Sequence, residues 1–161
     1  DDAAVAGAAA AVDVHSAAAF GEHETLRTLL DDAAARGEDA ANAVDAFGLT
    51  PLHEAAKYGA AAAARVLIAR GADVTAVDAS GNTALHYAAG GLHFEVAAAL
   101  IEAGAPVNAL DSRGRGALHL ATAGSDEGPD GTNAHRVVAA LLAAGADAAA
   151  KDRAGAVAVP W

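Results

Sequence analysis

Large apolar side chains occur in short clusters that end at a glycine, and alanine fills most positions between them. The pair Leu67-Ile68 precedes Gly71, and similar pairs precede Gly104 and Gly145. These glycines suit the left-handed conformation that ends many helices. Upstream, Thr50-Pro51 combines an N-cap residue with a proline at the first helical position. The pattern predicts pairs of helices of about 9–12 residues each, which are too short to be stable alone.

The helix pairs belong to a sequence repeat. The segment Asp45–His53 (DAFGLTPLH) recurs 33 residues later as Asp78–His86 (DASGNTALH), and after 33 more as Asp111–His119 (DSRGRGALH). A further copy starts at Asp152, 41 residues on, so one unit carries eight extra residues. A period of this length predicts an array in which each unit is stabilised by stacking on the next.

The repeated segments closely resemble the ankyrin repeat. The pattern DxxGxTPLHxAA runs here from Asp45 to Ala56, and a second family-like block, LIARGADV, spans 67–74. The resemblance covers roughly residues 12–157. It implies an all-α solenoid of about four helix-turn-helix repeats with short β-hairpin fingers. The predicted divisions are an Ala-rich lead-in (1–11), an ankyrin-repeat domain (12–151, with repeats at about 12–44, 45–77, 78–110 and 111–151) and a truncated C-terminal repeat or cap (152–161).

Three features depart from the repeat pattern. Gly116 replaces the threonine cap, which should cost only a few tenths of a kcal/mol. Leu92 stands where Gly59 turns between the helices of the preceding repeat, and the adjacent Gly90-Gly91 pair is expected to shift that turn by one residue. The eight extra residues form part of an insertion, 124–133, which is interpreted as an acidic loop between two helices, on the edge opposite the fingers.

Composition and charge exclude several functional classes. Alanine accounts for 52 of the 161 residues, and pairs such as Ala55-Ala56 recur in successive repeats, where small side chains let helices approach closely. The formal charge is −11 and the isoelectric point is near 4.8. This argues against nonspecific binding to nucleic acid or to anionic membranes. We therefore expect no nucleic-acid partner. No uncharged apolar run is long enough to span a membrane, so we also expect no membrane insertion.

The sequence offers little for catalysis or metal binding. The resemblance implies that His53, His86 and His119 each hydrogen-bond hairpin backbone, and stacking would leave their rings parallel rather than convergent on a metal. The segment from His53 to Lys57 lacks the second histidine of a HExxH zinc site. Asp45 and its equivalents are expected to accept hydrogen bonds from turn N–H groups. With no cysteine and no phosphate-binding loop, we expect no catalytic residue, no metal and no cofactor.

Positions that differ between repeats are the expected binding surface. The resemblance implies a concave face built from finger tips and exposed positions of the first helices. The candidate partner-binding residues of this kind are Phe20, Phe47, Leu49, Lys57, Tyr58, Ser80, Asn82, Arg113, Arg115, Lys151 and Arg153. Exposed aromatic residues are typical interface anchors, although burial against the next repeat would also explain them. The basic residues could equally form a solvated edge that offsets Asp111 and Asp152.

These observations predict a protein–protein interaction module (adaptor, scaffold or regulatory domain) that has no catalysis of its own. The groove is expected to be aromatic toward its N-terminal end and cationic toward its C-terminal end. A protein partner with an apolar anchor and an acidic segment would fit it. Two alternatives stay open: a fixed structural or targeting subunit of a large assembly, and a non-catalytic domain of a larger enzyme or channel.

Overall fold

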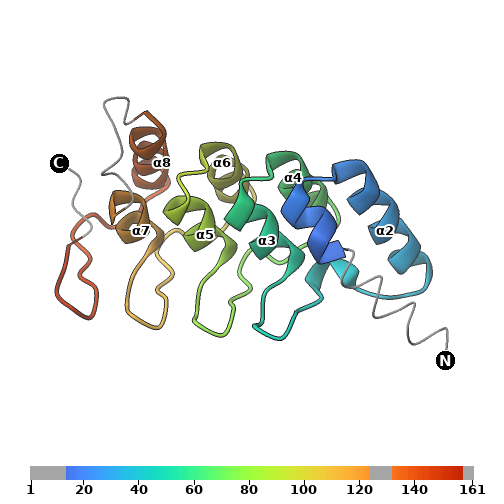
Figure 1. The fold of residues 1–161 in the computed structure, drawn as a ribbon. Coiled ribbons are helices and arrows are strands. Elements are labelled where there is room, and N and C mark those ends of the chain that lie inside the picture. The colour runs from blue at the N-terminus through green and yellow to red at the C-terminus, as the bar shows by residue number, and fades with distance from the viewer. Residues whose placement is uncertain (1–13, 124–131, 158–161) are drawn as a thin grey trace.

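The protein is a row of stacked helix pairs with turns projecting from one edge (Figure 1). The computed structural model describes residues 14–123 and 132–157. Residues 14–20 form the first helical segment. The elements that follow are α2 (His23–Ala35), η1 (Ala40–Asn42), α3 (Pro51–Tyr58), α4 (Ala61–Ala69), α5 (Ala84–Gly90), α6 (Phe94–Glu102), α7 (Ala117–Ala123) and α8 (Thr132–Ala143).

The helices form two layers, one built from the first helix of each pair and one from the second. Helix α5 packs between α3 and α7 in the first layer, and α2, α4, α6 and α8 follow one another in the second. Within the described residues there is no sheet, and the one β pairing is an isolated antiparallel bridge between Lys151 and Val157. The all-α solenoid predicted from the repeat is therefore confirmed.

The fingers are tighter than the β-hairpins expected from the resemblance. In the first finger, the Asp45 N–H donates to the Leu49 carbonyl at 3.0 Å and the Gly48 N–H donates to the Asp45 carbonyl at 3.1 Å. Two bonds close a five-residue turn, and among the described residues only the last finger adds β pairing beyond its turn, through the bridge between Lys151 and Val157. Each finger is thus a closed turn that projects its tip residues from the helical layers.

Helix starts follow the threonine caps. The Thr50 hydroxyl accepts the His53 N–H at 3.3 Å, and the His53 ring in return accepts the Thr50 N–H at 3.0 Å, which is a capping box. Thr83 and His86 repeat this arrangement at the start of α5. Before α7, Gly116 keeps only half of it, because its N–H donates to the His119 ring but it has no hydroxyl.

The turn between α5 and α6 differs from the expected one. Leu92 itself adopts the left-handed conformation, with φ of 57°, where Gly59 has 71°, and Gly91 stays right-handed at −85°. The turn therefore does not shift by one residue. A Cβ at Gly91 would lie 2.6 Å from the present position of the His93 ring, which would have to move, while the Leu92 side chain packs against the core.

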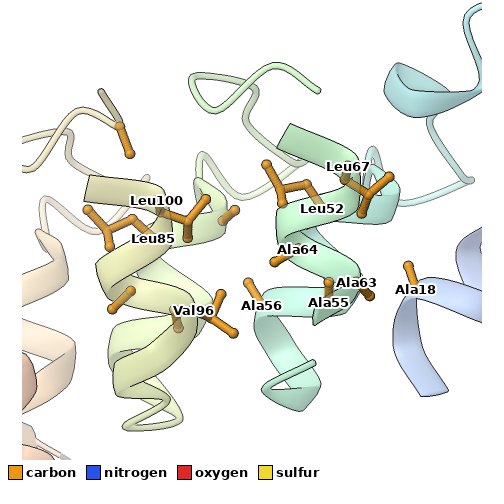
Figure 2. Close-up of a cluster of buried hydrophobic side chains, with 14 of the residues drawn as sticks. Ala18, Leu52, Ala55, Ala56, Ala63, Ala64, Leu67, Leu85, Val96 and Leu100 are labelled. Carbon is orange, nitrogen blue, oxygen red and sulfur yellow. The ribbon is translucent and has the colours of Figure 1, made fainter. Parts of the chain in front are cut away.

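The core consists mainly of alanine and leucine side chains, with fewer valines such as Val96 (Figure 2). Leu52 of α3 and Leu67 of α4 are both fully buried, and Leu85 and Leu100 repeat the arrangement one unit further on. Between the units the contact is made by alanine methyl groups such as that of Ala56, which has no exposed surface. Small side chains at these joints bring successive helix pairs into direct contact, so the core is continuous along the row.

The insertion and the C-terminal segment are described only in part. Residues 124–131 and 158–161, including Trp161, lie outside the described residues. Helix α8 begins at Thr132, so the last two residues of the predicted 124–133 insertion belong to that helix. The predicted repeat boundaries stay predictions.

The missing cap at α7 generates a stability prediction. A Cβ at Gly116 would meet its nearest neighbours at 3.7–3.8 Å, an ordinary contact distance, and one of these neighbours is the His119 ring. We expect Gly116→Thr to raise the free energy of unfolding by about 0.5–1 kcal/mol, because it restricts the unfolded chain and restores a capping hydroxyl. Chemical denaturation measures the change, and the reverse variant Thr83→Gly should lose a comparable amount. A lower free energy of unfolding for Gly116→Thr would contradict this explanation.

Candidate functional site

Each finger is shaped by the aspartate at its start. The Asp45 carboxylate accepts the N–H groups of Phe47 at 2.8 Å and Leu49 at 2.9 Å. Asp78 and Asp111 hold the corresponding N–H groups of their fingers in the same way, and Asp152 accepts that of Ala156. The predicted structural role of these carboxylates is confirmed.

Backbone hydrogen bonds place neighbouring finger tips in register. In each joint, an N–H from the later finger donates to a tip carbonyl of the earlier finger. The pairs are Ala79 to Phe47 at 3.0 Å, Ser112 to Ser80 at 3.0 Å and Arg153 to Arg113 at 3.1 Å. The accepting residues Phe47, Ser80 and Arg113 therefore form one row along the fingers.

The repeated histidines join each helix pair to the next finger. The Nδ1 atom of His53 accepts the Thr50 N–H, which places the ring proton on Nε2, and Nε2 donates to the Asn82 carbonyl at 2.9 Å. His86 bonds the Arg115 carbonyl at 2.9 Å, and His119 bonds the Ala156 carbonyl at 3.3 Å. The predicted hairpin role is confirmed, and His15 adds an unpredicted fourth case through the Leu49 carbonyl at 3.0 Å. Among the described residues, no group of acidic or histidine side chains has the arrangement of a metal site.

The predicted aromatic residues are exposed. Phe20 is 80% exposed, Phe47 71% and Tyr58 58%, so burial against the next repeat does not account for them. Phe20 and Tyr58 line one depression of about 270 Å³, together with Ala19, Ser16, His15 and Glu54. The Lys57 ammonium lies 5.5 Å from the centre of the Tyr58 ring. Phe47 is on the finger and is not part of that depression.

Leu49 does not belong to the exposed surface. It is only 9% exposed, its N–H donates to Asp45, and its carbonyl accepts from His15. Asn82 is the equivalent residue of the next finger, and it is half-buried and bonded through its N–H and carbonyl in the same way. The column of residues at this finger position therefore faces inward, whereas Ser80 at the tip is exposed.

Arg115 shares the inward position and is held by an ion pair. Its guanidinium donates to the Asp111 carboxylate from two nitrogens, at 2.9 and 3.0 Å. Burial raises the pKa of Asp111, but hydrogen bonds from the backbone and side chain of Arg115 and from the Arg113 N–H outweigh it, and the pKa lies below its usual value. Arg113, Lys151 and Arg153 are exposed, and their cations carry the basic character of these two fingers.

Tyr87 is a structural residue that the sequence pattern did not single out. Its hydroxyl donates to Asp78, and its ring meets His53 edge-on with 5.8 Å between ring centres. Burial, together with the Asp78 carboxylate, raises the pKa of Tyr87 to about 12. A tyrosine directly after a repeat histidine occurs in one repeat here, and no periodic signal identifies it.

Comparisons with known families agree with this geometry. A family model described as ankyrin repeats (3 copies) matches residues 71–152, and a second, described as ankyrin repeats (many copies), matches residues 34–88. The chain belongs to the ankyrin-repeat family. A search among curated proteins finds no significant match. Ankyrin repeats are generally protein–protein interaction modules, and this general function applies to the chain. Within the described residues, no helix has the length and apolar composition needed to cross a membrane.

The histidine bonds make the stability of the ankyrin array depend on pH. Burial lowers the pKa of His53 and of His86 from the ordinary value of 6.5. Below pH 6.5 the unfolded chain therefore binds more protons than the folded chain. The contribution of these two histidines to the free energy of unfolding is complete above that pH and is lost as the pH falls toward the lowered pKa. We expect the free energy of unfolding to decrease from pH 7.5 to pH 5.5.

Denaturation of variants at both pH values measures this dependence. The double variant His53→Gln/His86→Gln should be less stable at pH 7.5 but should lose less stability on acidification. His23→Gln is the matched control, because His23 is exposed, and it should keep the wild-type dependence. An unchanged pH dependence in the double variant would show that other groups cause it.

Proposed function

We propose that this ankyrin-repeat chain captures a protein partner on the surface formed by the fingers and first helices, and that this surface changes from aromatic to cationic along the row. The observation that carries the proposal is the finger row itself, in which Phe47, Ser80 and Arg113 follow one another at hydrogen-bonded tips. Phe20 and Tyr58 extend the aromatic end onto the first helices, and Lys151 and Arg153 extend the cationic end. Leu49 does not belong to this surface. Asn82 and Arg115 support the surface through the hydrogen bonds of their backbone N–H and carbonyl groups.

The fitting partner combines an apolar anchor with an acidic segment. Aromatic side chains at 58–80% exposure offer large apolar area at low entropic cost. Exposed cations speed encounter with an acidic segment and select against basic ones. An adaptor, scaffold or regulatory role would follow from such capture.

Two alternative roles differ from partner capture in the residues or the kind of contact that they would use. A fixed position in a large assembly would involve the 124–133 insertion, of which 124–131 lie outside the described residues. A non-catalytic domain of a larger enzyme or channel would use the same fingers for an internal contact.

Site-specific photo-crosslinking tests where the partner binds. A photoreactive amino acid at Ser80, on the finger row, should give stronger cross-links to the partner in a lysate of the source cells than one at Ala62, an exposed position of α4 in the second layer. Mass spectrometry of the cross-linked peptides identifies the partner segment. Equal or stronger cross-linking at Ala62 would place the interface elsewhere.

Charge reversal tests the cationic end with the partner so identified. Arg113→Glu/Arg153→Glu should weaken binding roughly tenfold at low salt and flatten its salt dependence, because exposed cations act mainly on encounter. Arg36→Glu/Arg65→Glu makes the same change in net charge away from the fingers, and these two arginines make only exposed ion pairs. Calorimetry at two salt concentrations measures both variants, and equal effects of the two would indicate a dependence on net charge alone.

A further inference from the structure

The depression beside Phe20 and Tyr58 is chemically unlike a simple apolar anchor site. It has a volume of about 270 Å³ and lies between the helical segment 14–20 and α3. The two aromatic side chains come from adjacent repeats and are both exposed. The face of an aromatic ring carries negative electrostatic potential, so exposed rings attract a cation.

Glu54 adds a full negative charge to the same depression. It lies on α3, lines the depression and is half-buried. Within the described residues, its carboxylate enters no ion pair and accepts no hydrogen bond from a side chain, whereas Glu24, Glu38 and Glu95 all have cationic partners. A purely apolar anchor would cover this carboxylate and remove water from it without compensation.

Elsewhere in the chain, an arginine side chain contacts an aromatic ring and a carboxylate together. On α6 and α8, the Arg136 guanidinium lies 3.9 Å from the centre of the Phe94 ring and 3.8 Å from the Glu95 carboxylate. A planar guanidinium can stack on a ring and bond a carboxylate at the same time. Phe20, Tyr58 and Glu54 bring the same kinds of group, aromatic rings and a carboxylate, to one depression.

We propose that this depression binds an arginine side chain of the partner, stacked on Phe20 and Tyr58 and paired with Glu54. The inference deepens the proposed function, on which it rests, by replacing the apolar anchor with a cationic one at the aromatic end. Lys57 lies over the Tyr58 ring but does not line the depression. Its ammonium repels an incoming cation, so it limits the affinity of the site.

Binding of a single capped arginine tests the site without the partner. The probe is N-acetyl-arginine methylamide, and N-acetyl-norleucine methylamide, which has a shorter side chain, is the apolar, uncharged comparison probe. Titrations followed by NMR of the Phe20 and Tyr58 rings should show millimolar binding of the arginine probe, several-fold tighter than that of the norleucine probe. Glu54→Gln and Phe20→Ala should each weaken it by about threefold or more, and Lys57→Gln should strengthen it.

The outcomes separate this inference from the proposed function. Norleucine binding as tight as arginine would overturn the cationic site while leaving an apolar anchor on the same surface. The absence of shifts at both rings with either probe would overturn the site altogether. Cross-linking at Ser80 can still succeed in both cases, since it detects a partner bound at the fingers. If the arginine probe binds but the partner does not cross-link at Ser80, that result would count against the proposed function alone. Unchanged thermal unfolding of Glu54→Gln and Phe20→Ala shows that the variants fold.

Discussion

The neutral imidazole of each repeat histidine holds one unit to the next, and the rest of the structure depends on it. In His53, one ring nitrogen accepts the N–H that starts its own helix, and the other donates to a carbonyl of the following finger. These two hydrogen bonds of one buried ring therefore fix the start of the helix and the position of the neighbouring unit, and together they set the tautomer of the ring. The net gain from such hydrogen bonds is only about 1 kcal/mol each, but leaving the buried groups unpaired would cost about 1–3 kcal/mol. The penalty for losing the bond, more than its net gain, enforces the spacing between units.

Alanine at the joints and the finger hydrogen bonds complete this constraint. Methyl groups such as that of Ala56 allow the close approach that the histidine bond requires, and the leucine pairs inside each unit supply the apolar burial that short helices lack. The contacts between fingers use backbone atoms at the tips, and the aspartate at the start of each finger holds the turn of that same finger. Because backbone atoms carry this register, the tip side chains are free to vary, and a row can change from phenylalanine to arginine without altering the fold.

The sequence predicts the repeating features well and the single features poorly. Thr50, Thr83 and Pro51 identify helix starts because capping depends on local bonds, and the histidine and aspartate roles follow from their recurrence. Leu92 breaks the glycine rule because its packing against the core, which is not visible in the local sequence, holds it in the left-handed conformation. The depression containing Glu54 was missed because its residues come from two repeats and only the aromatic pair stands out in the sequence.

The variable finger positions separate into two columns with opposite roles. The second residue after each aspartate (Phe47, Ser80, Arg113) points outward, and the fourth (Leu49, Asn82, Arg115) lies against the structure and offers its carbonyl to a histidine. A variable column is therefore not always a binding column. The fourth position accommodates leucine, asparagine or arginine because the contacts that recur in each repeat are made by the backbone, and the Arg115 guanidinium is paired with Asp111. The aromatic-to-cationic change along the surface consequently rests on the outward column and its neighbours, where Arg113 and Arg153 lie on fingers joined by a backbone hydrogen bond.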